Sequence, residues 1–102
     1  MRDADVIHLP ALPFPVPTIA ATTEGSPADI AQTINSVTHC VRAISYLGLP
    51  AMCVPAGFTS GPLPVAFQLV GRPFQEATLL RVADAYQRDT RWHRAMPPVA
   101  CQ

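Results

Sequence analysis

The sequence has 102 residues, enough for at most one small domain. Hydrophobic residues make up 49% of it, and charged residues make up only 14%, below the roughly 25% of an ordinary soluble domain. Seven basic residues balance seven acidic ones, which argues against nucleic acid or an anionic membrane as a partner. This composition is typical of a protein interior, so we expect a piece of a larger α/β core.

The N-terminal part predicts a short strand and a stiff connector. Asp5 to Leu9 (DVIHL) is a short apolar run that suits a buried strand. Four prolines then indicate an extended segment that is neither helix nor central strand: Pro10, Pro13, Pro15 and Pro17. A ligand for an SH3-like domain is the alternative interpretation of this segment. We expect a loop from Ile19 to Gly25.

A helical region follows. Ser26, Pro27 and Asp29 form a typical helix start, with a hydroxyl N-cap, proline at N1 and a carboxylate at N3. Apolar residues then recur at steps of three and four, which predicts one buried helix face: Ile30, Ile34, Val37, Val41 and Ile44. Gly48 and Pro50 end the pattern. We therefore predict one helix from Pro27 to Leu47, or two with a break near Ser36.

The next region predicts a β-hairpin. Ala51 to Ala56 and Leu63 to Val70 are strand-like, and the turn-forming residues 57–62 between them are few enough for an antiparallel connection. The second strand is apolar at nearly every position except Gln68. We therefore expect helices to cover both of its faces.

The chain then returns to helix. We predict a helix from Gln75 to Arg88, followed by a short tail over residues 91–102 in which Trp92 is a packing anchor. The residues expected to be buried on this helix are Leu79, Leu80, Val82, Ala83 and Tyr86.

The cysteines and histidines do not predict a redox or metal site. Cys40, Cys53 and Cys101 are scattered, no secretory or targeting pattern is visible, and no apolar run reaches the ~20 residues of a membrane span, so we expect a cytoplasmic protein. No zinc-ligand or nucleotide-binding spacing occurs, so we expect neither metal nor cofactor. His39 beside Cys40 leaves open a thiol hydrolase, although adjacent helical residues are poorly placed for a relay. Cys53, in mid-strand, should be packed.

Three ordered blocks carry a family resemblance. They read GLPAMCVPAG (48–57), LPVAFQLVG (63–71) and FQEATLLRVADAY (74–86). They resemble the C-terminal blocks of amidase signature hydrolases, G-x-P-A-x-x-V-P-x-G, L-P-x-G-x-Q-x-x-G and F-x-E-x-x-L-L-x-x-A-x-x-Y. The resemblance extends from Asp5 to about His93. It implies that residues 1–102 are the C-terminal part of an incomplete amidase domain, with a partial mixed sheet of one short N-terminal strand plus an antiparallel hairpin, flanked by two helical segments.

The resemblance also implies a chemistry that this sequence lacks. The family hydrolyses carboxamide C–N bonds with a Ser–Ser–Lys relay, without metal or cofactor. The chain has no lysine and no segment like the family's glycine- and serine-rich nucleophile segment. A serine needs an adjacent base to attack an amide, so we expect no catalytic residue here and no activity of the chain alone.

The resemblance implies substrate-pocket candidates at Thr38, Val41 and Ser45, which are equally interpretable as helix surface. It implies as partner the N-terminal part of an amidase, or self-association through open sheet edges. An inactive remnant and an interaction module that completes another amidase chain are the alternatives.

Four positions depart from the family pattern and suggest relaxed constraint. Ser45 stands where the family usually has Asn, Pro62 and Ala66 stand where it has Gly, and Gln75 stands where it has a capping Asp.

Overall fold

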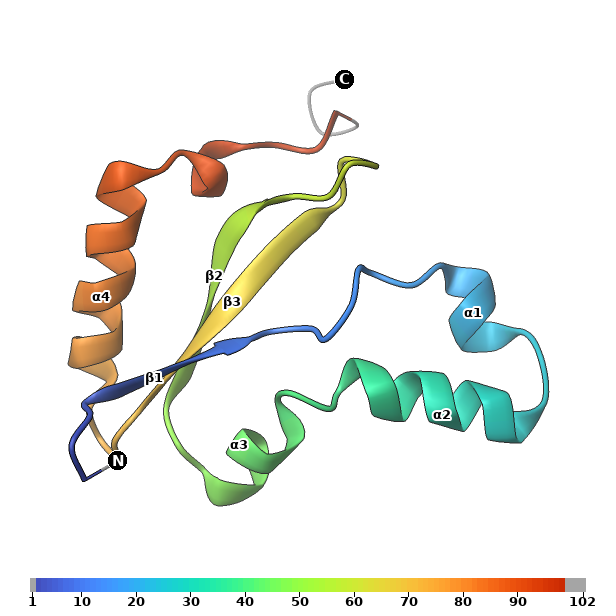
Figure 1. Ribbon diagram of the computed structural model, residues 1–102, viewed down its shortest axis with the longest axis horizontal. Helices are drawn as coiled ribbons and strands as arrows, with labels where there is room; N and C mark the ends of the chain where they lie inside the picture. The colour runs from blue at the N-terminus through green and yellow to red at the C-terminus, as the bar shows by residue number, and fades with distance from the viewer. Residues whose placement is uncertain (1, 99–102) are drawn as a thin grey trace.

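The computed structural model describes residues 2–98; Cys101 lies outside the described residues. Figure 1 shows a sheet with α4 along one side and α2 reaching away from it on the other. The elements in chain order are β1 (Val6–Pro10), α1 (Ile19–Thr23), α2 (Pro27–Val37), α3 (Arg42–Leu47), β2 (Ala51–Phe58), β3 (Pro64–Gly71), α4 (Glu76–Asp89) and the 3-10 turn η1 (Trp92–Arg94).

The sheet has three strands in the order β1-β3-β2, and β3 is antiparallel to both neighbours. The predicted N-terminal strand and hairpin are therefore confirmed. Within the described residues every strand pair is antiparallel, so the mixed part of the expected sheet is not seen there. The hairpin register shifts between Pro55 and Gly57. The indole of Trp92 lies over this irregular site, with ring atoms 3.8 Å from the position a Cβ would take on Gly57.

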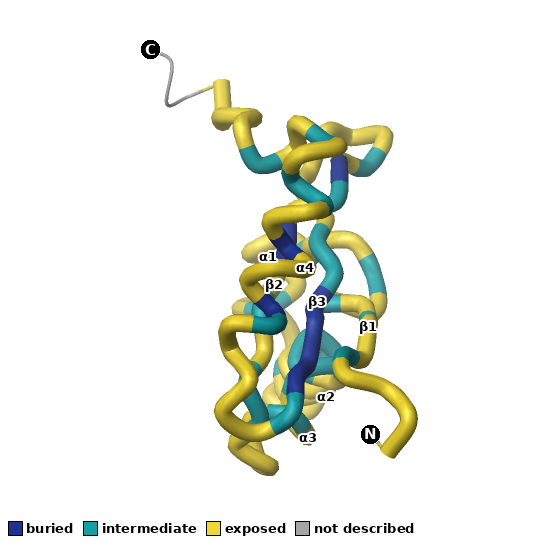
Figure 2. Tube along the Cα trace, turned by 90° about the vertical axis from the view of Figure 1, so that its left-hand side faces the viewer, coloured by how far each residue is buried: buried dark blue, intermediate teal, exposed yellow. Residues whose placement is uncertain are grey.

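The central strand carries most of the burial. Gln68, Leu69 and Val70 are all buried, and Val70 is 0% exposed. In Figure 2 the longest dark-blue stretch lies on β3. A strand between two others has its backbone paired on both edges, and its near-continuous apolar sequence suits cover on both faces.

The core lies between the sheet and α4. Leu79 and Ala83 of α4 pack with Leu69 and Val54. The ring of Phe67 continues this core, in edge contact with Tyr86 at 5.0 Å. These contacts hold α4 along one face of the sheet.

The prediction that Leu80 and Val82 are also buried is wrong, since they are 56% and 41% exposed. They lie on the flanks of α4, and within residues 2–98 the helix packs on the sheet through the stripe that contains Leu79 and Ala83.

The predicted region from Pro27 to Leu47 forms two helices, the second of the two expected arrangements. Ser26 caps α2 as predicted: its hydroxyl accepts the Asp29 N–H at 3.2 Å and donates to the Asp29 carboxylate at 2.8 Å. The expected burial of the apolar stripe is wrong. Neither α2 nor α3 has a buried residue, and Ile34 is 49% exposed. The apolar residues share one helix face because they recur with helical periodicity. This face stays uncovered because α2 extends away from the sheet (Figure 1).

The loop expected from Ile19 to Gly25 is also corrected, because residues 19–23 form the short helix α1. The Thr18 hydroxyl accepts the Ala21 N–H at 3.2 Å and so caps the helix. The hydroxyls of Thr22 and Thr23 both donate to the Ile19 carbonyl, at 2.8 and 2.9 Å. The Thr18 bond pairs an N–H at the start of the helix, and the other two bonds reinforce its first turn, in a five-residue helix that has no apolar periodicity.

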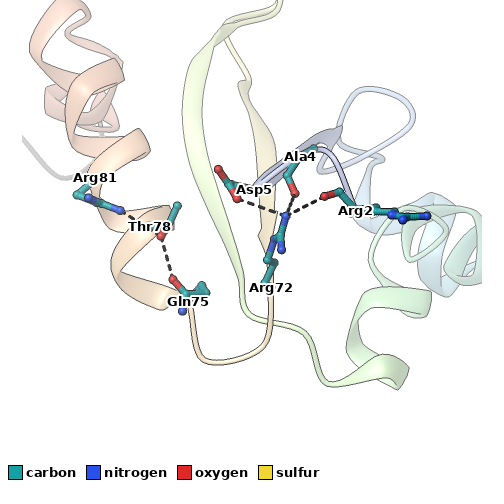
Figure 3. A network of polar contacts seen from close by, with 7 residues as sticks. All are labelled: Arg2, Ala4, Asp5, Arg72, Gln75, Thr78 and Arg81. Carbon is teal, nitrogen blue, oxygen red and sulfur yellow. Dashed lines mark hydrogen bonds and ion pairs between the residues drawn. The ribbon is translucent and has the colours of Figure 1, made fainter.

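Polar contacts tie the N-terminal segment to the end of β3 (Figure 3). Arg72 donates to the Ala4 carbonyl at 3.0 Å and lies 3.4 Å from the Asp5 carboxylate. The Asp5 side chain is 83% exposed, so this ion pair contributes little. Gln75, the N-cap of α4, makes no side-chain cap bond, as the departure from the family's capping Asp suggests.

Gly71 offers a test of the packing between β3 and α4. A Cβ there would lie 3.2 Å from Cγ and Cδ2 of Leu79, which is held in the core. We expect Gly71→Ala to lower the free energy of unfolding by about 1–3 kcal/mol through overpacking. Gly61→Ala is the matched control, because nothing lies within 4 Å of its Cβ position. Denaturant midpoints followed by circular dichroism, measured with the N-terminal part of an amidase bound, compare the two; equal midpoints would contradict this packing.

Candidate substrate-pocket segment

The three candidate residues lie where α2 gives way to α3. Thr38 is the C-cap of α2, Val41 is the N-cap of α3, and Ser45 lies within α3. The Val41 N–H donates to the Thr38 carbonyl at 3.2 Å, and the Ser45 N–H donates to the Val41 carbonyl at 3.0 Å. The structure therefore brings their backbones together along one segment. The side chains of Thr38 and Val41 are half-buried, and that of Ser45 is exposed.

The Thr38 hydroxyl is already engaged in local bonds. It donates toward the Ile34 carbonyl at 3.2 Å and accepts from Arg42 Nη2 at 3.2 Å. The same Arg42 nitrogen donates to the Asn35 carbonyl at 2.6 Å. A cation near the last carbonyls of a helix is favoured by the helix dipole. Arg42 therefore closes the end of α2 and holds Thr38.

A shallow, open groove lies beside this segment, and we call it the α2 groove. It has a volume of about 720 Å³ and is lined by Pro13, Phe14, Ala28, Ala31, Gln32, Asn35, Ser36, His39 and Arg42. None of the three candidates lines it. Its polar lining was missed by the sequence reasoning. The spacing of Gln32, Asn35, Ser36 and His39 is the signal that could have found it, since steps of three and four place side chains on one helix face.

The α2 groove has two walls of different origin. Pro13 and Phe14 belong to the proline-rich segment after β1, and the other lining residues belong to α2, the connector 38–41 and the start of α3. The chain next to each wall is bonded to the central strand through one residue. Gln68 Nε2 donates to the Cys40 carbonyl at 2.8 Å and to the Pro10 carbonyl at 3.1 Å.

The cysteines and histidines are dispersed over the fold. Cys40 is half-buried, whereas Cys53 is exposed, so the expectation that Cys53 is packed is wrong. Cys53 lies on edge strand β2 and alternates with the core residue Val54, which places it on the face away from α4. His8 packs on Phe67 with ring centroids 4.7 Å apart. Within residues 2–98 no group of three or more His, Cys, Asp or Glu side chains is placed to hold a metal.

No helix of the described chain combines the length and the apolar character needed to cross a bilayer.

Comparison with known proteins identifies the family. The sequence profile of the family described as Amidase matches residues 1–80. The chain is 59% identical over 61 residues to a glutamyl-tRNA(Gln) amidotransferase subunit of Chloroflexus aggregans, covering 60% of this chain and 12% of that protein. It is 43% identical over 98 residues to the subunit of the same name from Roseiflexus castenholzii, covering 96% of this chain and 19% of that protein.

The chain thus spans less than a fifth of the length of these relatives. The profile covers most of the chain and includes the first two blocks of the resemblance, G-x-P-A-x-x-V-P-x-G and L-P-x-G-x-Q-x-x-G, in their expected order. This chain belongs to the amidase family.

Proposed function

We propose that this chain is the C-terminal part of an amidase domain and does not carry the catalytic residues itself. The observation that carries the proposal is a family match over residues 1–80 in a sequence that has no lysine. The amidase signature relay uses lysine as its base, so this base must come from residues outside these 102. The parent enzyme would act on carboxamide C–N bonds, consistent with relatives named as subunits of an amidotransferase.

Chemical reasoning supports inactivity of the chain alone. Amide hydrolysis needs an activated nucleophile, and donors that stabilise the oxyanion contribute several kcal/mol to lowering the barrier. Among residues 2–98 the cysteine nucleophiles to consider are Cys40, which is half-buried, and Cys53, which is exposed on a strand at the edge of the sheet.

The segment from Thr38 to Ser45 is the part of the chain that we propose faces substrate in the complete enzyme. Its residues adjoin the α2 groove, whose polar lining includes the amide of Asn35 and the imidazole of His39. Such groups suit hydrogen bonds with a carboxamide, which has both donors and acceptors. His39 and Arg42 of this segment line the groove, whereas Thr38, Val41 and Ser45 do not. The roles proposed for Thr38, Val41 and Ser45 are binding roles, not catalytic ones.

The shape of the chain supports a missing complementary segment. The radius of gyration is 15.9 Å, compared with about 13 Å for a compact domain of 100 residues. The chain is also thin, with extents of 44 × 37 × 20 Å. Several large apolar side chains are more than half exposed, among them Ile19, Tyr46, Leu47, Phe74, Leu80 and Met96. Burying a Leu or Phe side chain is worth about 1.5–3 kcal/mol each. We propose the N-terminal part of an amidase domain as the partner that covers them.

A second candidate function rests on the sheet edges. The order β1-β3-β2 leaves one side of β1 and one side of β2 without a strand partner among residues 2–98. Open edges pair readily with other chains. A non-enzymatic module that completes or binds another amidase chain, or that associates with itself, is therefore the alternative. The departures at Ser45, Pro62, Ala66 and Gln75 fit a copy under relaxed constraint, including an inactive remnant.

The activity of the purified chain tests the first proposal. We expect no hydrolysis of aliphatic or aryl amides above background, because the relay is incomplete. Ammonia release followed by a coupled assay measures it, with heat-denatured chain as the control. Turnover that survives repurification and disappears in Cys40→Ser or Cys53→Ser would overturn the proposal and favour a thiol mechanism.

The behaviour of the chain in solution tests the missing segment. We expect the isolated chain to be aggregation-prone or molten, because its apolar surface and strand edges are uncovered. Size-exclusion chromatography and thermal unfolding measure this. Addition of an N-terminal amidase segment, for example that of the Roseiflexus castenholzii relative, should yield a dispersed complex, whereas an unrelated α/β protein of equal size should not. A monodisperse monomer that unfolds in one sharp transition would instead establish a free-standing domain.

A further inference from the structure

Gln68 is a polar residue in the most buried strand of the chain. Its side chain is 2% exposed, beside the buried residues Leu69 and Val70 and the half-buried Phe67. Burying an amide is costly unless its donors are satisfied. The Nε2 nitrogen of Gln68 has two hydrogens and reaches two carbonyls, so its donors are satisfied.

The two acceptors belong to segments far apart in the sequence. The Pro10 carbonyl is 58 residues away, at the end of β1 where the proline-rich wall of the α2 groove begins. The Cys40 carbonyl is 28 residues away, in the connector between Thr38 and Val41. One side chain on the central strand is therefore bonded to two backbone carbonyls that lie outside the groove lining, three residues before Pro13 on one side and directly after His39 on the other.

The chemistry of the two acceptors selects glutamine at this position. A carboxylate of the same shape would place oxygen against two carbonyl oxygens, and a methionine of similar size would offer no donor. Either change removes both hydrogen bonds, which are partly buried, and with them their contribution to holding the two segments. The requirement is for a side chain with two hydrogens on one terminal nitrogen.

We infer that Gln68 is a positioning residue that sets the spacing of the α2 groove walls and the place of Thr38 and Val41. It acts through the Pro10 and Cys40 backbone and touches no reacting group. The substrate-binding consequence rests on the proposed function, whereas the geometric role does not.

The wild-type chain supplies the first test. In the dispersed protein, free or in complex with its complementary segment, side-chain amide protons are followed by hydrogen exchange in nuclear magnetic resonance spectra. We expect those of Gln68 to exchange at least about tenfold more slowly than those of the exposed Gln32, as protected hydrogen bonds require. Equal exchange rates would overturn the inference without any variant.

The thiol of Cys40 supplies the second test, because it sits in the connector that Gln68 holds. Gln68→Met keeps the side-chain size but removes both donors. We expect Cys40 to react with a maleimide about tenfold faster in this variant, the factor expected for the loss of a hydrogen bond or two. Gln87→Met on α4 is the matched control and should leave the rate unchanged. Peptide mass analysis separates Cys40 from Cys53 and Cys101. An unchanged rate in Gln68→Met overturns the inference.

A kinetic readout connects the geometry to binding. In an active complex with the complementary amidase segment, Gln68→Met should raise KM several-fold more than it lowers kcat, and Gln87→Met should change neither. A fall in kcat alone would overturn the positioning role toward substrate. An inactive wild-type complex would contradict the proposed function, while the proton exchange and thiol results would still decide the geometric role of Gln68.

Discussion

The burial of β3 is the constraint on which the rest of this structure depends. The strand is central, almost entirely apolar and buried from Gln68 to Gly71. One face of it is covered by α4 through Leu79, and the two edges are filled by β1 and β2. Removing apolar surface from water lowers the free energy of the folded chain. The neighbouring elements therefore take the positions in which they bury the side chains and pair the backbone of this strand.

Helix α2, which does not pack on β3, remains exposed to solvent. α2 carries a helical apolar stripe and a well-formed N-cap at Ser26, but it has no buried residue. Its helix and N-cap agree with its sequence, whereas no other element packs over its apolar stripe closely enough to bury a residue. A helix with well-formed local structure and no cover over its apolar stripe is typical of a segment of a larger domain, in agreement with a chain that spans less than a fifth of the two relatives compared above.

The chemistry of the chain follows the same division. The family blocks lie on the hairpin and α4, where they make the core, and the chain has no lysine with which to build the family's relay. The polar side chains that line the α2 groove include those of Asn35, His39 and Arg42, and none of the three is acidic. Arg42 is already bonded to the end of α2, where it holds the helix terminus.

The sequence by itself determined the family, the hairpin, the capped start of α2 and the position of α4, because these depend on periodicity, turn residues and local hydrogen bonds. It did not reveal α1, which depends on threonine hydroxyls in a segment without periodicity, nor the exposure of Leu80, Val82, Ile34 and Cys53. Whether a side chain is buried depends on whether another helix or strand packs against its face of the helix or sheet. The local sequence pattern does not contain that information. Only the tertiary structure decided that Gln68 meets the Pro10 and Cys40 carbonyls, since contacts across 58 and 28 residues exist only once the chain has folded.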